Sequence, residues 1–461
     1  MNRFNQLSDW LAWQEALHHK SVDFGIERIG QVATRLGIGT RLPFAVISVA
    51  GTNGKGSCVA LLESILRQAG YRVGAYTSPH LLRYNERIRV MGQEASDRVL
   101  MEAFQEIDEA RDGTTLTYFE FSTLAAVMLF RRAGLDVAIL EVGVGGRLDA
   151  VNLFDADLAL ITTIGIDHVA WLGHSRESIG REKAGICRSG CPAVCGDPQP
   201  PISLTDHARS IGAFLYRTGK DFWFSMDTTE GWHWDSVMGN AHRGLPKPAL
   251  PGRHQIQNAA AVLMGIELIR NRLPVSTEAL RRGLGAVTLP GRFQALLGKD
   301  GVTRILDVAH NQKAAQMLAR MLLSYPRAGR TLAVFGILED KDMEAVLRAL
   351  WAVVDAWYVS DLHVPRGRTA KEITTTMSRI EPGVSVTPAT TVLDAYDSAS
   401  RSARPGDRIR DIRFVPYRKR SVEILGSRRL QRPNKQCVRE SSEDPSPRRS
   451  SRRFGGGLPL P

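Results

Sequence analysis

The feature that most constrains the fold is a short apolar segment followed at once by a glycine-rich turn and a segment with helical spacing. Residues 44–50 read FAVISVA, residues 51–57 read GTNGKGS, and apolar side chains recur at helical spacing over residues 57–68. A strand, a tight turn and a helix in this order bring backbone N–H groups and the positive end of the helix dipole to one point. The segment therefore predicts an anion-binding loop in an α/β fold.

This loop differs from the common nucleotide-binding pattern G-x-x-x-x-G-K-[ST]. Gly54 and Lys55 are present, but Gly56 follows the lysine and the hydroxyl group comes one residue later, at Ser57. Lys55 supplies a positive charge for the β- and γ-phosphate oxygens, and Ser57 can offer its hydroxyl group to Mg²⁺. A glycine-rich turn with a surface lysine is the alternative. The order of strand, turn and helix favours phosphate binding.

Strand and helix patterns alternate along most of the chain. Apolar runs at residues 135–142 and 158–164 are typical of strands buried on both faces of a parallel sheet. A second series of strands and helices begins near Pro290. Between the two series, residues 221–251 are rich in Trp, Gly and Pro, and we expect a β-rich excursion of the first domain there. The patterns predict an α/β protein with two domains.

The positive charge is concentrated at the end of the chain. The net charge is +12, and residues 410–461 contain fourteen Lys or Arg but only five Asp or Glu. The rest of the chain is therefore nearly neutral, which argues against nucleic-acid binding by this body. No apolar run approaches the ~20 residues that span a bilayer, and the N-terminus lacks a signal-peptide core. We expect a cytoplasmic protein with no membrane contact.

The five cysteines fit a reducing compartment. Cys187, Cys191 and Cys195 recur at every fourth position, so a metal site is conceivable. Gly190 and Pro192 interrupt the helix that would bring these thiols together, and incidental cysteines are the favoured interpretation.

Eight motifs resemble, in register, those of the folylpolyglutamate synthase/dihydrofolate synthase family, which belongs to the Mur-ligase-like group. They are GTNGKGS, TSPHLLRYNERIRV, LTYFEFSTLAA, EVGVGGRLDAVN, DH at residues 167–168, REKAGI, LPGRFQ and LDVAHN. The resemblance is strongest to the bifunctional bacterial members and runs from about residue 10 to about residue 409. It implies a P-loop ATPase-type Mur-ligase-like domain at residues 1–288 and a smaller Rossmann-like α/β domain at residues 289–409.

The resemblance implies an ATP-dependent ligase that joins L-glutamate to dihydropteroate and to reduced folates. ATP would phosphorylate a carboxylate of the acceptor, and the amino group of glutamate would then displace phosphate from the acyl phosphate. Mg²⁺, a lysine and helix N-termini would hold the negative charge. Two alternatives are a folylpolyglutamate synthase only, and a catalytically impaired ATP- or folate-binding body with a basic tail. The family resemblance also suggests a monomer.

The resemblance further assigns roles to individual residues. ATP would be bound by the loop and by residues further along the chain: Thr52, Asn53, Gly54, Lys55, Gly56, Ser57, Asn258, Arg292 and Asp307. Mg²⁺ would be held by Ser78, Glu141 and His168, each at the C-terminal end of a predicted strand. A hydroxyl, a carboxylate and an imidazole form a plausible set if water and phosphate oxygens complete the octahedron. Lys55, Lys183 and His310 would be catalytic, and the second domain would close over ATP.

Lys183 in REKAGI resembles the lysine that is carbamylated in this family. Carbamylation would replace a cation beside the metal with an anion. The alternative is a solvent-facing helical lysine paired with Glu182.

Dihydropteroate would be bound by three segments, according to the same resemblance. They comprise Ser21, Val22, Asp23 and Phe24, then Tyr118, Phe119, Glu120 and Phe121, and finally Leu148, Asp149 and Ala150. Aromatic rings can stack on a flat pterin, and a carboxylate such as Asp149 can accept hydrogen bonds from its amino groups. Each aromatic residue is equally compatible with a place in the core.

The chain departs from the family pattern after Ile409. The pattern leads to an apolar strand, a G-S-F turn and a helix, whereas residues 410–461 are rich in Arg, Ser, Pro and Gly. This composition predicts a disordered basic tail. One hypothesis is a frameshift near Ile409, because codons exist for residues 410–425 whose neighbouring frame reads VIFGSFHTVSEVLKYL. A genuine tail that binds nucleic acid or another acidic partner is the alternative.

Overall fold

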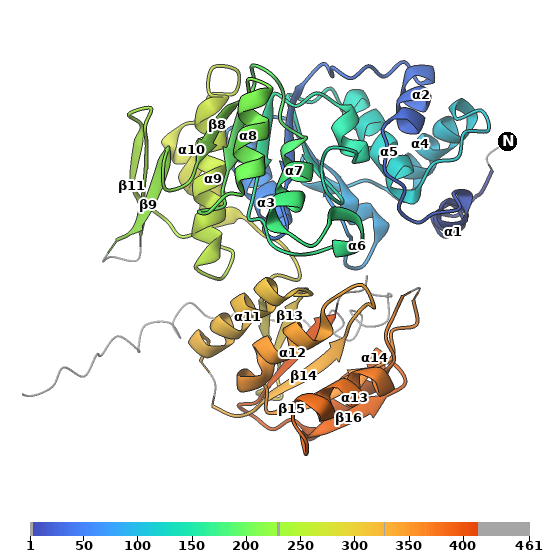
Figure 1. Cartoon of the computed structure of the whole chain (residues 1–461), viewed down its shortest axis with the longest axis vertical. Helices are drawn as coiled ribbons and strands as arrows, with labels where there is room; N and C mark the ends of the chain where they lie inside the picture. Colours follow the sequence, from blue (N-terminus) through green and yellow to red (C-terminus); the bar gives the residue numbers. More distant parts are fainter. Residues whose placement is uncertain (1–2, 228–230, 327, 365, 414–461) are drawn as a thin grey trace, which may run out of the picture.

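The computed structural model describes residues 3–227, 231–326, 328–364 and 366–413 (Figure 1). Two α/β units lie one above the other in this view, and the fold class agrees with the prediction. In this described part, no helix combines the length and the apolar character that a membrane span needs.

The first sheet has eight strands in the order β4-β3-β2-β5-β1-β6-β7-β8. They are β1 (Ala45–Ala50), β2 (Val73–Tyr76), β3 (Ile88–Val90), β4 (Gln93–Glu94), β5 (Val137–Glu141), β6 (Leu158–Ile161), β7 (Pro192–Cys195) and β8 (Phe214–Arg217). Along the sheet, the neighbours in the part β2-β5-β1-β6-β7-β8 are all parallel. At the other end, β3 pairs antiparallel with β2, and β4 pairs antiparallel with β3. The loops after β1, β2, β5 and β6 therefore share one edge, where ligands bind in open α/β sheets.

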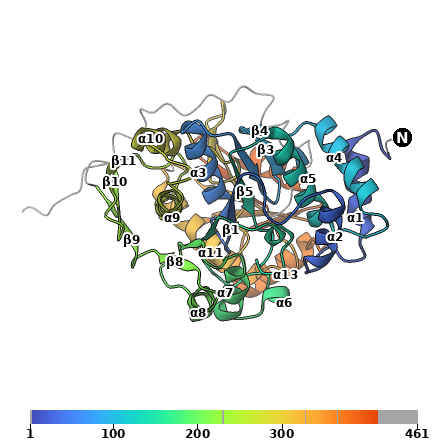
Figure 2. The same ribbon diagram turned by 90° about the horizontal axis from the view of Figure 1, so that it is seen from above.

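Helices cover both faces of this sheet (Figure 2). The face with α3 (Lys55–Gln68), α9 (His254–Leu268) and α10 (Thr277–Ala286) forms one apolar cluster. The other face is covered by α1 (Leu7–Leu17), α2 (Glu27–Arg35), α4 (Asp97–Ala110), α5 (Tyr118–Ala133), α7 (Arg176–Ala184) and α8 (Ile202–Ser210). Three short helices complete the unit: η1 (Tyr84–Arg87), η2 (Ala150–Leu153) and α6 (Val169–Leu172). Residues from distant parts of the chain thus meet around one parallel core.

Two glycines give the predicted anion-binding loop its shape. Gly51 has a φ of 145° and Gly54 a φ of 98°, a region that favours glycine. A Cβ atom on Gly51 would overlap Thr162 Oγ1, and one on Gly54 would lie 2.7 Å from Asn258 Oδ1. The backbone therefore turns sharply out of β1 and enters α3 at Lys55.

The segment between the two units forms a small antiparallel sheet, as the sequence predicts. It consists of β9 (Phe222–Met226), β10 (Trp232–Ser236) and β11 (Ala241–Leu245) in the order β11-β10-β9. Trp232 and Trp234 are fully buried, and the Trp234 indole donates a hydrogen bond to the Ala260 carbonyl of α9 at 3.1 Å. These side chains attach the small sheet to the first unit.

The second sheet has six strands in the order β12-β13-β17-β14-β15-β16. They are β12 (Gln294–Leu297), β13 (Thr303–Asp307), β14 (Thr331–Gly336), β15 (Ala356–Ser360), β16 (Val386–Ala389) and β17 (Arg408–Arg413). One face packs on α11 (Gln312–Ser324), α12 (Met343–Leu350) and α13 (Ala370–Ile380), and a short helix, η3 (Trp351–Val353), follows α12. The other face packs on α14 (Val392–Ser402).

The last strand corrects one sequence prediction. We expected the domain to end at Ile409 and the disordered tail to begin at Arg410, but β17 continues to Arg413 and pairs in parallel with both β13 and β14. Backbone N–H and C=O groups of a polar segment can still pair with neighbouring strands, so composition alone misjudged these four residues. The rest of the predicted tail, residues 414–461, lies outside the described residues.

Candidate active site

A cavity of about 340 Å³ opens at the carboxyl ends of the strands of the first sheet. Its walls include the anion-binding loop and most residues that the sequence singled out. These are Ser21, Val22, Asp23, Phe24, Thr52, Asn53, Gly54, Lys55, Gly56, Ser78, Tyr118, Phe119, Glu120, Glu141, Leu148, Asp149, Ala150, His168, Lys183, Arg292 and His310. Phosphate, metal and pterin candidates therefore share one space.

Two lysines, the half-buried Lys55 and the buried Lys183, converge on the carbonyl group of Gly51 in the loop. Lys55 Nζ donates to it at 3.1 Å, and Lys183 Nζ donates to it at 3.0 Å. Burial, together with the charge of Lys55, lowers the pKa of Lys183 to about 7. The alternative of a solvent-facing Lys183 paired with Glu182 is wrong, because Lys183 is 4% exposed and Glu182 instead pairs with Arg147 at 2.9 Å.

The three metal candidates approach the cavity from the carboxyl ends of three strands: Glu141 is the last residue of β5, Ser78 follows β2 and His168 follows β6. Glu141 is buried, which raises the pKa of its carboxyl group against the opposing charges of Lys55 and Arg292. Burial likewise lowers the pKa of His168 to about 3, so its imidazole is neutral and can be a metal ligand. Its Nδ1 atom is buried without a hydrogen-bond partner among the described residues.

These groups fit Mg²⁺ only with help from the substrates. In the described part of the chain, no three His, Cys, Asp or Glu side chains gather closely enough to hold a metal ion. Glu141 could supply one oxygen ligand and His168 one nitrogen ligand, and the Ser78 hydroxyl lines the same cavity as a third candidate. Mg²⁺ commonly keeps water and phosphate oxygens as its remaining ligands, and the phosphate loop borders the same cavity.

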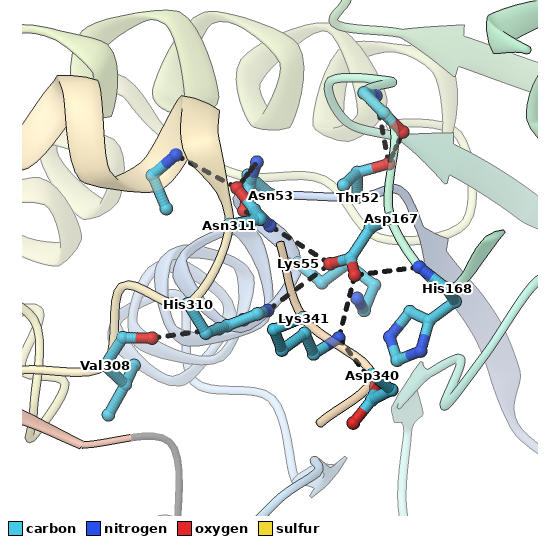
Figure 3. Close-up of polar contacts among 12 residues, drawn as sticks. Thr52, Asn53, Lys55, Asp167, His168, Val308, His310, Asn311, Asp340 and Lys341 are labelled. Atoms are coloured by element: carbon cyan, nitrogen blue, oxygen red, sulfur yellow. Dashed lines mark hydrogen bonds and ion pairs between the residues drawn. The ribbon is translucent and has the colours of Figure 1, made fainter. Parts of the chain in front are cut away.

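A polar cluster joins the carboxyl ends of the two sheets (Figure 3). Asp167, which follows β6, accepts a hydrogen bond from Lys341 Nζ at 2.7 Å and from Asn311 Nδ2 at 3.0 Å. His310 Nε2 lies 3.4 Å from the same carboxylate. The Asn311 side chain also exchanges hydrogen bonds with Asn53 of the loop at 3.1 and 3.2 Å. The second unit is thus connected directly to the phosphate loop of the first.

The charges of this cluster favour an ionised Asp167. Burial raises the pKa of its carboxyl group, but the hydrogen bond to His310 and the positive charge of Lys341 outweigh that effect. The net result is a pKa well below the ordinary value. A stable anion therefore lies between the two units.

Arg28 links charged groups of two pterin segments, while the carboxylate of the third is bonded to its own loop. Arg28 Nη1 donates to Asp23 at 2.7 Å, and Arg28 Nη2 donates to Glu120 at 3.0 Å. Asp149 accepts hydrogen bonds from the backbone N–H groups of Gly143, Val144 and Val151 at 3.0–3.1 Å. This carboxylate therefore holds the loop after β5 in place, a role that the sequence did not predict.

Two models of domain families match the chain. The Mur ligase middle domain matches residues 49–265, and the Mur ligase glutamate ligase domain matches residues 291–410. The dihydrofolate synthase/folylpolyglutamate synthase of Escherichia coli (strain K12) is 46% identical over 403 residues, which cover 87% of this chain and 92% of that protein. The protein of the same name from Haemophilus influenzae is 40% identical over 417 residues, covering 87% and 93%.

The chain belongs to the dihydrofolate synthase/folylpolyglutamate synthase family.

Solved structures of this family have the same fold. The structure of E. coli FolC in complex with DHPP and ADP has a TM-score of 0.81 at 44% identity, covering 88% of this chain and 94% of that one. A bifunctional folylpolyglutamate synthase/dihydrofolate synthase with Mn, AMPPNP and L-glutamate bound has a TM-score of 0.82 at 43% identity, covering 91% and 98%. Members of the family are ATP-dependent ligases of the Mur ligase type.

Four of the residues assigned from the family resemblance line neither this cavity nor the second one described below. Phe121 is fully buried and packs edge-on against Trp13 and Phe104, so its ring lies in the core, as in the alternative interpretation of this aromatic residue. On the α-helix α5, successive residues point about 100° apart, so Phe121 faces the core while Tyr118 and Phe119 face the cavity.

The other three support the walls from behind. Ser57 is buried within α3. Asn258 Nδ2 donates to Gln255 at 2.9 Å, and Asp307 accepts from the backbone N–H groups of Phe293 and Ala309, both at 2.9 Å. In this structure they shape the surroundings of the site without facing the cavity.

Sequence reasoning assigned no role to Asp167, Asn311 or Lys341. Asp167 and Asn311 belong to the quoted motifs DH and LDVAHN, directly beside His168 and His310. Lys341 lies in the segment LEDKD, which follows the carboxyl end of β14. The phosphate loop follows the carboxyl end of β1 in the same way. The signal that could have identified these residues is their position, since polar residues that follow parallel strands lie where ligands bind.

A second, larger cavity of about 640 Å³ lies on the other side of the loop residue Gly56. It is bordered by the segment from Thr77 to Leu82 and by residues of the second unit, including Val308 and Leu338. Both cavities are lined by Gly56, Ser78, Pro79, Glu141, Arg292 and His310. The two spaces therefore meet at the same polar centre.

Proposed function

We propose that this chain joins L-glutamate to dihydropteroate, and also to reduced folates, in ATP-dependent reactions that proceed through an acyl phosphate. The observation that carries the proposal is the cavity in which a phosphate loop, three metal candidates and three pterin segments meet. The relatives' complexes with DHPP and ADP, and with Mn, AMPPNP and L-glutamate, support this choice of substrates.

In the proposed reaction, the loop from Gly51 to Ser57 binds the ATP phosphates with its N–H groups and with Lys55. Ser78, Glu141 and His168 would hold Mg²⁺, which when bound offsets negative charge on the phosphate groups. Lys183 would be carbamylated. Its buried amino group has a pKa near neutrality, so a substantial fraction is uncharged and able to react with carbon dioxide.

The second unit would complete the site when ATP is present. Arg292 and His310 border the cavity from that unit, while Asn258 and Asp307 would support the nucleotide from behind it. Asp167 holds His310, Asn311 and Lys341 together at the junction. This arrangement places the groups of both units around the carboxylate that must be phosphorylated and then attacked by glutamate.

The second cavity supports a bifunctional enzyme over the alternative of a folylpolyglutamate synthase only. Two acceptors of different size share one reactive group, a carboxylate, and the two cavities share one polar centre. We infer that the chain acts as a monomer in the cytoplasm and needs no nucleic acid, in keeping with the family resemblance. Light scattering on the purified chain tests the monomeric state.

The deciding experiment measures glutamate-dependent ADP release by the purified chain, first with dihydropteroate and then with a reduced folate. We expect turnover with both acceptors. Glu141→Gln should lower kcat by about 100-fold or more, because a metal ion contributes several kcal/mol of charge stabilisation. Turnover with a reduced folate alone would support the narrower synthase, and ATP binding without turnover would support the catalytically impaired body.

A further inference from the structure

Arg87 is a buried cation that none of the proposed roles uses. It is the last residue of η1, is 8% exposed, and lines the 340 Å³ cavity beside Tyr118. Its Nε atom donates a hydrogen bond to His80 Nδ1 at 2.9 Å. Within the residues that the structure describes, its guanidinium forms no ion pair with a carboxylate.

The surroundings of Arg87 fix the direction of its side chain. The guanidinium carbon lies 5.3 Å from the centre of the Tyr118 ring and 5.7 Å from that of Tyr84, within the range of cation–π contacts. Tyr84 is held in turn by a hydrogen bond from its hydroxyl group to Ser122 at 2.8 Å. Arg87 is therefore preorganised and needs little rearrangement to bind a ligand.

The backbone of Arg87 places it next to a metal candidate. Its carbonyl group accepts a hydrogen bond from the N–H of Thr77 at 2.9 Å, and Ser78 is the following residue. The side chain thus lies between the pterin segment at Tyr118 and the polar end of the cavity. A charge in such a buried position is costly unless an opposite charge comes to it.

The chemistry of the proposed substrate supplies one such charge. The pterin ring of dihydropteroate is neutral, and its single carboxylate is attached to the aminobenzoate ring. That carboxylate is the group to be phosphorylated, so it must lie where the pterin segments meet the metal candidates. A planar guanidinium matches a carboxylate through paired N–H groups.

We propose that Arg87 binds the acceptor's aminobenzoate carboxylate and positions it for phosphorylation. This inference rests on the proposed function, since it takes dihydropteroate as the acceptor. His80 then serves to orient the guanidinium from the side of the larger cavity, which His80 lines and Arg87 does not.

The test compares two ligands and two variants by isothermal titration calorimetry. The ligands are dihydropteroate and the same molecule with hydrogen in place of the carboxylate. Arg87→Gln should raise the Kd of dihydropteroate by about tenfold or more, because a charge-assisted hydrogen bond is lost. The Kd of the ligand without a carboxylate should stay within about twofold. Arg98→Gln, a change at a highly exposed arginine of α4, is the matched control and should alter neither Kd.

Two results would overturn the role of Arg87 alone: an unchanged Kd of dihydropteroate in Arg87→Gln, or an equal weakening of both ligands. The second result would indicate a general disturbance of the cavity. Arg87→Lys keeps the charge without the planar fork and should bind dihydropteroate with intermediate affinity. A wild-type chain that binds neither ligand would overturn the proposed acceptor itself, and with it the role of Arg87.

Discussion

The two sheets differ most at their central strands. In the first sheet, β1 lies between β5 and β6, and all six of its residues are buried and apolar except for Ser48. In the second sheet, β17 lies between β13 and β14 but reads RIRDIR. Strands buried on both faces of a parallel sheet are normally near-continuous apolar runs. The first sheet follows this rule and the second does not.

Two buried arginines of β17 differ in how well their guanidinium groups are hydrogen-bonded. Arg408 is buried but well bonded, since it donates to Thr331 Oγ1 at 2.7 Å and to the Leu322 carbonyl at 2.8 Å. Arg410 is fully buried beside Ile305 of β13. Its three guanidinium nitrogens have no hydrogen-bond partner among the described residues.

Burial lowers the pKa of Arg410 to about 9, although Asp307 lies 3.6 Å away and opposes the shift. The difference between the sheets shows that backbone hydrogen bonds can hold a strand in the middle of a sheet even when its charged side chains are poorly suited to burial.

The largest expected effect comes from restoring an apolar residue in β17. Arg410→Val should raise the free energy of unfolding by about 1–4 kcal/mol, because it replaces a poorly bonded buried charge with an apolar side chain. Urea denaturation of the full chain measures this change. Arg408→Val is the matched control and should not stabilise, since it leaves the carbonyl groups and Thr331 without their donor. A loss of stability in Arg410→Val would show that the Arg410–Asp307 pair outweighs the cost of burial.

The frameshift hypothesis makes a related prediction at the level of the gene. The neighbouring reading frame would place Val at position 410 and Ile at position 411, in keeping with a buried central strand. Sequencing of the 3′ end of the gene from fresh template tests it. Codons for residues 410–425 that are incompatible with the second frame would rule the hypothesis out. A genuine tail would instead predict salt-dependent binding to nucleic acid that is lost on deletion of residues 410–461.

A smaller effect is expected where the carboxyl ends of the two sheets face each other. Lys341→Met removes the bond to Asp167 and should lower kcat/KM for glutamate by about tenfold, since one charge-assisted hydrogen bond no longer aligns the two units. Steady-state kinetics measure this, and the Kd of a non-hydrolysable ATP analogue should change little. Lys371→Met, at an exposed lysine of α13, is the control. Unchanged kinetics would show that the Asp167 cluster does not guide catalysis.

Sequence reasoning located the fold and the centre of the site because local order carried the information. A strand, a glycine turn and a helix define the phosphate loop within 25 consecutive residues, 44–68, and Glu141 lies near the end of an apolar run. The direction of the Phe121 ring could not be predicted, because it depends on how α5 packs against α1 and α4. Lys341 was missed because its partner, Asp167, lies 174 positions away in the sequence. Relations set by packing between distant elements leave no local pattern.

The comparison between the sheets can be sharpened with a second buried charge. Asp149 of the first unit is buried like Arg410, but its carboxylate accepts three backbone N–H groups. Burial nevertheless outweighs these bonds and raises the pKa of Asp149 to about 6, from an ordinary value of 3.8. The folded state therefore holds this proton more tightly than the unfolded chain. The resulting stabilisation is present below about pH 4 and is lost as the pH rises through about 6.

Asn does not titrate, so the pH dependence of Asp149→Asn isolates this effect. From pH 5 to pH 7, the free energy of unfolding of the variant, relative to the wild type, should rise by about 1 kcal/mol. Urea denaturation at several pH values measures the difference, with Asp206→Asn at an exposed position of α8 as the control. The absolute stability of Asp149→Asn can lie on either side of the wild type, because the amide accepts fewer hydrogen bonds. A difference that falls with rising pH would mean that three N–H groups fully compensate the burial of Asp149, leaving Arg410 as the costlier of the two buried charges.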